Sequence, residues 1–275
     1  MTGNIIIEAG QSEKNYWKDL WKYKELFYIL SWRDIKVRYK QTTIGLLWAI
    51  IRPFLTMVVF TVVFGNLAGM NNDKSTPYSI VVLAGLLPWQ FFSTAFASAS
   101  ESLILNSNLL TKVYFPRLIV PISSIVTNFV DFLISFFILF LLMIYYYYSP
   151  SWHVFFLPFF IVLTILLSCG VGIYFAVLNV KYRDFRYVTP FIVQIGLYVS
   201  PVGFSSNVVP EKWKLIYNLN PMVGIIDGFR WCILGDKADS PLSINFFVSI
   251  IIIFLILFFS VYKFRKMEKT FADII

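Results

Sequence analysis

The sequence predicts an all-α membrane protein with six transmembrane helices, and three observations support this fold class. Hydrophobic residues make up 58% of the 275 residues and charged residues 14%, whereas soluble globular domains average roughly 45–50% and about 25%. Apolar runs of about 20 residues, long enough to cross a bilayer, recur along the chain. Basic residues gather in alternate connecting segments, as in multi-pass membrane proteins. These features exclude a disordered chain and argue against a water-soluble enzyme.

Residues 1–43 form the longest stretch outside the apolar runs, and we interpret them as a cytoplasmic interface segment. Within residues 16–40, aromatic and basic side chains interleave at helical spacing, which predicts a helix with an aromatic side and a basic side. Such a helix lies on a membrane surface. Either it only anchors the chain to anionic lipid, or it also docks a protein. The candidate interface residues are Trp17, Trp21, Arg33, Lys36, Arg38 and Tyr39.

Six apolar segments follow when Gly, Pro and charge clusters are taken as boundaries. Together they make a transmembrane domain over residues 44–263, followed by a cytoplasmic tail over 264–275. Pro53, Pro88 and Pro190 lie in or near these segments, where neighbouring helices can satisfy the backbone groups that a proline frees. The predicted spans are residues 44–66, 78–101, 118–147, 154–178, 187–203 and 242–263.

The charge distribution predicts the orientation of these spans. With the N-terminus in the cytoplasm, eighteen of the 23 basic residues lie on the cytoplasmic side, and the outer side carries five basic and five acidic residues. The positive-inside rule therefore favours six spans with both termini in the cytoplasm. The net charge of +8 is accounted for by this topology, so it does not indicate nucleic-acid binding.

Residues 204–240, between the fifth and sixth predicted spans, are too long and too apolar for an ordinary loop. Pro210 opens one predicted short helix, and Asn220 is the predicted N-cap of another, with Pro221 at its first position. At about 10 and 14 residues, neither helix can cross a bilayer. Two arrangements fit these lengths: a hairpin over about residues 205–235 that dips into the outer leaflet, or a cap on the outer surface.

Asp131 is the one acidic residue deep in an apolar run, where a charged group costs on the order of 3 kcal/mol. Its side chain must therefore face protein or water. Either Asp131 and Asn128 line a hydrated path for a polar substrate, or Asp131 is hydrogen-bonded to a Ser or Thr of a neighbouring helix. Arg52 lies near the cytoplasmic face, and we favour a side chain that extends to the interface.

Aromatic residues are abundant, and four tyrosines follow one another at 145–148. At the outer end of a span, these tyrosines fit an interfacial belt. Aromatic rings also stack on the apolar faces of sugars, so the same residues could guide a glycan. The channel candidates are Asn128, Asp131, Trp89, Phe92, Tyr145 and Tyr148.

We expect no catalytic, metal-binding or cofactor site in this chain. The thirteen glycines include no Walker A pattern, and no common metal or nucleophile motif occurs. His153 is the sole histidine, which leaves little basis for histidine-dependent catalysis. The chain by itself is therefore not expected to hydrolyse ATP.

Five segments resemble the membrane-spanning permeases of ABC-type polysaccharide export systems, which move O-antigen, capsule or teichoic-acid chains. They occur in the family's order with similar spacing and cover nearly the whole chain, and the first is the most specific. The segments are RDIKVRYKQTTIGLLWAIIRP (33–53), AGLLPWQFF (84–92), NSNLLTKVYFPR (106–117), NVKYRDFRYV (179–188) and YNLNPM (217–222).

The resemblance implies a homodimer of six-span subunits in the bacterial inner membrane, bound to two copies of a separate ATPase that holds ATP and Mg. The two permease chains would form a channel, within membrane lipid, for a polyprenyl-lipid-linked polysaccharide such as O-antigen. An ABC exporter of the same architecture for a small molecule or drug is an alternative, and a non-ABC secondary transporter is a more distant one. A secondary transporter would more often show internal repeats, and none is convincing here.

The resemblance also implies roles for individual segments. Residues 16–40 would be the interface helix, and residues 205–235 would form an outer gate. Residues 106–117 would be the coupling helix seated on the ATPase, with the loop 181–186 as a second contact. The gate candidates are Trp213, Tyr217, Asn220 and Pro221. The coupling candidates are Asn106, Leu110, Lys112, Tyr114, Phe115, Pro116, Arg117, Lys181, Arg183 and Asp184.

Overall fold

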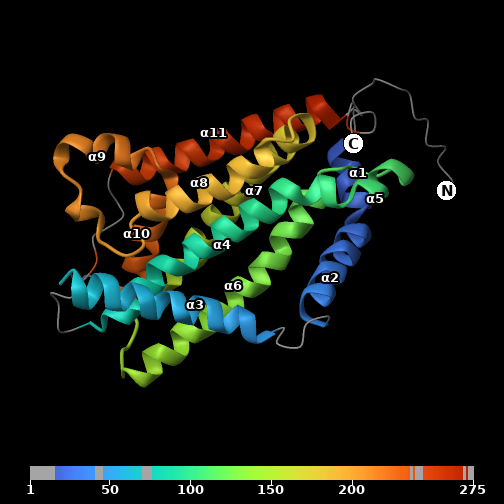
Figure 1. Cartoon of the computed structure of the whole chain (residues 1–275). Helices are drawn as coiled ribbons and strands as arrows, with labels where there is room; N and C mark the ends of the chain where they lie inside the picture. The colour runs from blue at the N-terminus through green and yellow to red at the C-terminus, as the bar shows by residue number, and fades with distance from the viewer. Residues whose placement is uncertain are drawn as a thin grey trace.

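The computed structural model describes residues 16–40, 46–69, 76–235, 238, 244–268 and 271. Within these ranges the chain forms helices joined by short turns, without a strand (Figure 1), so the predicted all-α fold is confirmed. Residues 1–15 and 41–43 of the predicted interface segment, and residues 269–270 and 272–275 of the predicted tail, lie outside the described residues. The α-helices are α1 Tyr16–Lys22, α2 Lys24–Lys40, α3 Leu46–Phe60, α4 Tyr78–Leu105, α5 Ser107–Lys112, α6 Ile119–Tyr145, α7 Leu157–Lys181, α8 Phe185–Val199, α9 Glu211–Asn218, α10 Pro221–Leu234 and α11 Ile244–Met267. The shorter elements are the π-helix η1 Thr61–Leu67 and the 3₁₀ helices η2 Trp152–Phe156 and η3 Ser206–Val208.

Helix α4 forms the centre of the bundle, because it packs against α3, α6, α7, α8 and α10. Its side chains Leu83, Leu87 and Phe96 are almost completely buried. Gly172 of α7 allows a close approach to α4, since a Cβ at this position would lie 2.7 Å from the Cβ of Ala99. Lipid tails are as apolar as these side chains, so close packing holds membrane helices together where the hydrophobic effect does not.

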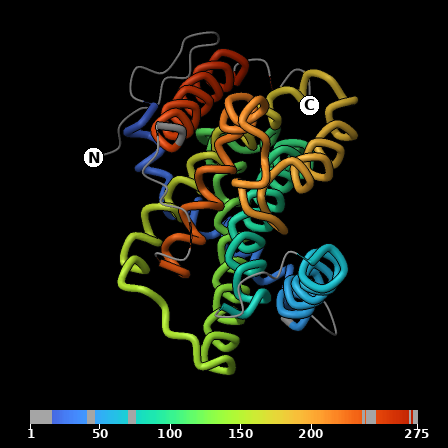
Figure 2. The backbone as a smooth tube through the Cα atoms, turned by 90° about the vertical axis from the view of Figure 1, so that its left-hand side faces the viewer, coloured from blue at the N-terminus to red at the C-terminus, as the bar shows by residue number. Residues whose placement is uncertain are grey.

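Among the described residues, five helical stretches are long and apolar enough to cross a membrane: Leu47–Leu67, Tyr78–Leu105, Ile119–Tyr145, Trp152–Lys181 and Phe246–Met267. The first stretch runs through α3 and η1, and only 11% of the residues in its apolar window are buried. In the second stretch this share is 72%. Figures 1 and 2 both place α3 at the edge of the bundle. The exposed apolar face of α3 must therefore meet lipid or another protein chain.

Helix α8 is shorter than the span predicted over residues 187–203. Its 15 residues extend about 22 Å, less than the roughly 30 Å of a bilayer's hydrocarbon core. The helix ends at Val199 because Pro201 follows Ser200, and a residue that precedes proline avoids the helical conformation. Ser200 is accordingly extended, with φ −91° and ψ 150°. The count of six spans stays a prediction.

The two short helices predicted between the last spans are present as α9 and α10. Helix α9 begins at Glu211 after Pro210, and Pro221 is the first residue of α10. The Asn220 side chain accepts a hydrogen bond of 3.1 Å from the Met222 backbone N–H, as expected of an N-cap. Helix α10 packs against α4, α7 and α11, while α9 presents mostly exposed side chains. Their position relative to the membrane stays a prediction.

Helices α1 and α2 occupy the region of the predicted interface helix, but aromatic and basic side chains do not separate onto opposite sides. Trp21 and Trp32 are 74% and 47% exposed, and the Nζ atoms of Lys24 and Lys36 lie 5.9 and 5.3 Å from their ring centroids. The predicted separation is therefore wrong. The other face of α2 is taken up by packing against α6, so both kinds of side chain share the outer face.

Candidate functional site

The candidate coupling residues of the segment 106–117 lie between α4 and α6, around the short helix α5. Leu110 and Phe115 are buried, 4% and 3% exposed, in an apolar cluster with Ile119, Val177 and Phe264. Pro116 is also buried, whereas Lys112 and Tyr114 are exposed. The buried residues join this segment to α6, α7 and α11, and the exposed residues are available to a partner.

Both ends of this segment are held by other parts of the chain. At its start, the Arg33 Nη2 of α2 donates a hydrogen bond of 2.9 Å to the Oδ1 of Asn106. At its end, the backbone N–H of Arg117 donates to the Oε1 of Glu268 at 2.8 Å, and the Arg117 Nη1 donates to the Glu268 carbonyl at 2.5 Å. Helix α1, helix α5 and the end of α11 lie close together at one end of the bundle (Figure 1).

Tyr16 and Glu268 are functional candidates that sequence reasoning missed. The Tyr16 hydroxyl donates to the Glu268 Oε1 at 3.3 Å, and the Arg265 guanidinium lies 4.7 Å from the centroid of the Tyr16 ring. Burial, together with the neighbouring Glu268 carboxylate, raises the pKa of Tyr16 above its usual range. The available signal was a single acid, Glu268, within the basic run 263–269.

The second candidate contact, the loop between α7 and α8, is exposed. Lys181 ends α7, and Arg183 and Asp184 precede α8; all three side chains are exposed. The Arg186 Nε lies 3.9 Å from the Oε1 of Glu101 near the end of α4. This ion pair places the α7–α8 loop beside the last turns of α4, directly before α5.

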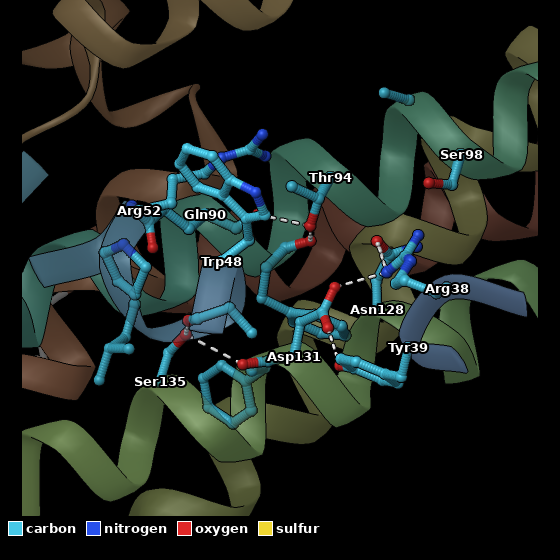
Figure 3. Close-up of a pocket in the computed structure, with 16 residues that line it drawn as sticks. Arg38, Tyr39, Trp48, Arg52, Gln90, Thr94, Ser98, Asn128, Asp131 and Ser135 are labelled. Atoms are coloured by element: carbon cyan, nitrogen blue, oxygen red, sulfur yellow. Dashed lines mark hydrogen bonds and ion pairs between the residues drawn. The ribbon is translucent and has the colours of Figure 1, made fainter. Parts of the chain in front are cut away.

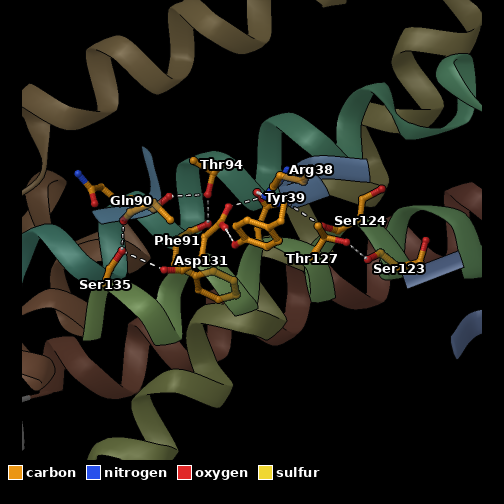
Figure 4. A network of polar contacts seen from close by, with 12 residues as sticks. Arg38, Tyr39, Gln90, Phe91, Thr94, Ser123, Ser124, Thr127, Asp131 and Ser135 are labelled. Atoms are coloured by element: carbon orange, nitrogen blue, oxygen red, sulfur yellow. Dashed lines mark hydrogen bonds and ion pairs between the residues drawn. The ribbon is translucent and has the colours of Figure 1, made fainter. Parts of the chain in front are cut away.

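A cavity of about 580 Å³ lies between α2, α3, α4 and α6 (Figure 3) and contains Asp131. The Arg38 Nη1 of α2 lies 2.5 Å from the Asp131 Oδ2, and the Tyr39 hydroxyl donates to the Oδ1 (Figure 4). The same Arg38 nitrogen donates to the Asn128 Oδ1 at 3.2 Å. An ion pair and two hydrogen bonds, each with one charged partner, therefore connect α2 to the middle of α6.

The Asp131 side chain has partners that differ from the Ser or Thr considered in the sequence analysis. Its carboxylate is held by Arg38 and Tyr39, whereas the Ser135 hydroxyl donates to the Asp131 backbone carbonyl at 2.9 Å. Asp131 and Asn128 also line the cavity, as a polar path would require. Arg38 and Tyr39 are candidates from the interface segment, and the structure joins them to two channel candidates.

The remaining channel candidates lie elsewhere. Trp89 and Phe92 are 5% and 8% exposed within the main core, and neither lines the cavity. Tyr145 is 74% exposed at the end of α6, and the Tyr148 hydroxyl donates to the Leu234 carbonyl at 3.5 Å. Sequence reasoning missed the cavity residues Gln90, Thr94 and Ser98 of α4, although their spacing of four residues marks one polar face in an apolar helix.

The gate candidates surround the irregular segment after α8. The Asn220 Nδ2 donates to the Ser200 Oγ at 3.0 Å, while Trp213 is 56% exposed. Burial raises the pKa of Tyr217 above its usual range. Sequence reasoning counted Arg230 among outer-loop charges, but it is 6% exposed and donates to the carbonyls of Val202 and Phe204 at 2.8 and 2.7 Å.

The described part of the chain brings together no three His, Cys, Asp or Glu side chains that could hold a metal ion.

The candidate site consists of two connected parts: the segment around α5, and the cavity around Asp131. Helix α2 links them, because Arg33 contacts Asn106 and Arg38 contacts Asp131. Such a connection can carry movement of the α5 region to the cavity.

Comparisons with known proteins agree with a transport function. Residues 25–234 match the family model described as ABC-2 type transporter. The chain is 26% identical to the O-antigen export system permease protein RfbA of Klebsiella pneumoniae, over 91% of this chain and 95% of the relative. It is 26% identical to RfbA of Myxococcus xanthus, over 91% and 96%. It is 24% identical to the polysialic acid transport protein KpsM of Escherichia coli, over 85% and 91%.

Proposed function

The chain belongs to the ABC-2 type transporter family, and from this membership we propose that it exports a polyprenyl-lipid-linked polysaccharide, such as O-antigen, across the bacterial inner membrane. Members of this family are membrane subunits and not enzymes, and a partner ATPase hydrolyses the ATP. ATP and Mg bind that partner. The chain described here supplies the path through the membrane and the surface that receives the movement of the partner.

The observation that supports this substrate class is the agreement among the relatives. The RfbA and KpsM proteins are named for O-antigen and polysialic acid, which are different glycans but both long polysaccharides. Their similarity to this chain covers 91% and 85% of it, so both the cavity and the α5 segment lie within the matched length. A long, polar, lipid-linked chain is therefore the proposed cargo.

The proposed assembly is a homodimer with two ATPase subunits. Leu55, Val59 and Val62 of α3 and η1 are each more than 40% exposed, and an apolar face of this kind has to be covered by lipid or by a second copy. The fifth of the six proposed spans is formed by α8 and the segment 200–203, so that both termini lie in the cytoplasm. The concentration of basic residues at α1, α2 and the end of α11 supports this orientation.

In the proposed mechanism, the ATPase pushes on the exposed residues Lys112 and Tyr114. The segment moves as a unit because Leu110 and Phe115 are packed into the cluster with α6, α7 and α11. The contact between Arg33 and Asn106 passes the movement to α2, and Arg38 passes it to Asp131. The cavity between α2, α3, α4 and α6 therefore changes shape with the state of the ATPase.

Deletion of the gene followed by complementation tests the function. We expect the surface to lose its polysaccharide and lipid-linked glycan to accumulate inside the cell, with both effects reversed by the wild-type chain. Tyr114→Ala restores membrane insertion but not export. An unchanged surface glycan together with accumulation of a small molecule in the deletion strain would instead identify an exporter of small molecules.

A further inference from the structure

We propose that Arg52 forms an anion site in the cavity between α2, α3, α4 and α6, and that this site takes the phosphate-bearing linkage between polyprenyl and glycan. This inference rests on the proposed function and assigns the cavity to one part of the substrate. The bound group is the phosphate or pyrophosphate, with the first sugar beside it.

Among the described residues that line the cavity, one cation is left uncompensated. The charged residues of this described lining are Arg38, Arg52 and Asp131, which carry a formal net charge of +1. Arg38 is committed to Asp131, whose second carboxylate oxygen accepts from Tyr39. Among the described residues, the Arg52 guanidinium has no hydrogen-bond or ion-pair partner. A guanidinium is a fork of donors that matches the oxygens of a phosphate.

Neutral polar groups line the same cavity. Gln90 and Ser98 lie on one face of α4, and their side chains make no hydrogen bond within the described ranges. Thr94, between them, is already bonded through its hydroxyl to the Gln90 carbonyl at 2.8 Å. In Figure 3, Arg52, Trp48 and Gln90 lie together at one side of the cavity, and Arg38, Tyr39 and Asn128 at the other. The side with Arg52 is therefore the side with unused donors.

Trp48 and the size of the cavity identify what accompanies the anion. Trp48 precedes Arg52 by one helical turn, lines the cavity and is 55% exposed. Its indole offers an aromatic face on which the apolar side of a sugar ring stacks. The volume of about 580 Å³ is in the range of small-molecule sites, so it accommodates a linkage region but not a polymer. The rest of the glycan must extend out of the cavity.

A phospholipid headgroup offers the same phosphate chemistry, so the test compares two lipids. The full chain, purified with its partner ATPase in nanodiscs, is titrated with polyprenyl pyrophosphate and, separately, with phosphatidylglycerol. We expect Arg52→Gln to weaken polyprenyl pyrophosphate binding by about tenfold to a hundredfold, as is typical when a charge-assisted hydrogen bond is lost. Arg52→Lys keeps the charge and recovers part of the affinity. Lys22→Gln, which removes an exposed cation of α1, leaves the affinity unchanged.

The outcomes separate this inference from the proposed function. Unchanged binding of polyprenyl pyrophosphate to Arg52→Gln overturns the site, even if the wild-type complex exports glycan. An equal loss for both lipids also overturns it, because the cavity would then be a general phospholipid site. If the wild-type complex does not bind polyprenyl pyrophosphate, the proposed substrate class itself fails. Thermal unfolding of each variant checks that a loss of binding is not a loss of folding.

Discussion

The Oε1 of Glu268 accepts a hydrogen bond of 2.8 Å from the backbone N–H of Arg117, a residue 151 positions earlier in the chain. The Arg117 side chain completes the contact by donating to the Glu268 carbonyl. This pair joins the end of α11 to the start of α6, close in the sequence to the exposed residues Lys112 and Tyr114. The contact with the end of α11 therefore resists a force that is applied to the α5 segment.

Glu268→Ala is expected to uncouple ATP hydrolysis from export. The change removes the acceptor for the Arg117 N–H and the Tyr16 hydroxyl, which costs about 1–3 kcal/mol of stability, and it frees the end of the α5 segment. The measurement is glycan exported per ATP hydrolysed. Glu268→Gln keeps an oxygen acceptor and retains more of this ratio. Glu211→Ala, at a carboxylate 95% exposed on α9, is the matched control, and an equal effect there would refute the role of Glu268.

Tyr114→Ala and Phe115→Ala are expected to have different consequences although the residues are adjacent. Tyr114 is 47% exposed and Phe115 is 3% exposed. Truncation of the exposed ring leaves the free energy of unfolding within about 0.5 kcal/mol but weakens co-purification of the ATPase. Truncation of the buried ring costs about 3–5 kcal/mol. Thermal unfolding and co-purification, measured on both variants, separate the effects, and equal destabilisation by the two changes would contradict the structure.

The Arg38–Asp131 pair is expected to show energetic coupling between α2 and α6. Asp131→Leu leaves Arg38 and Tyr39 without their acceptor and lowers stability by about 1–3 kcal/mol. Arg38→Met combined with Asp131→Leu is less destabilised than the sum of the single changes, with a difference of about 0.5–3 kcal/mol. The double-mutant cycle is measured by thermal unfolding in nanodiscs. Strict additivity would show that the pair does not stabilise the protein.

The stability that Tyr16 contributes to the contact between α1 and α11 is expected to decrease at alkaline pH. Its folded pKa is raised above the ordinary value of 10.0 by burial and by Glu268. The neutral phenol therefore contributes stability that is fully present below pH 10 and is lost progressively above it, as the unfolded chain ionises first. We expect wild-type stability to fall more steeply than that of Tyr16→Phe as the pH rises above the ordinary tyrosine pKa of 10.0. Parallel thermal-unfolding curves for the two proteins would exclude this contribution.

Features set by local sequence could be predicted, and features set by distant partners could not. Pro210, Asn220 and Pro221 predict the starts of α9 and α10 because capping and proline geometry act within a few residues. The end of α8 at Val199 also has a local cause, Pro201. The apolar residues continue beyond Pro201, so the hydrophobic pattern alone predicted a span that was too long.

The distribution of side chains on α2 depends on α6, which lies about 90 residues away, so helical periodicity alone gave the wrong faces. The sequence singled out Asp131 and Arg38 for separate reasons, but their pairing at 2.5 Å is a long-range contact. The same holds for Glu268, whose partner Arg117 is recognisable only in the folded chain. Local patterns identified Asp131 and Arg38 but not Glu268, and tertiary packing determined the partners of all three.

ATP-dependent movement of lipid-linked polysaccharide in inverted membrane vesicles tests the central claim most directly. The cytoplasmic face of such vesicles is outside, so labelled polyprenyl-linked glycan starts exposed to an added glycosidase. With the chain and its ATPase present, addition of ATP and Mg should make the label resistant to the enzyme, and omission of ATP should leave it sensitive. Equal resistance in vesicles from a strain that lacks the chain would contradict the account.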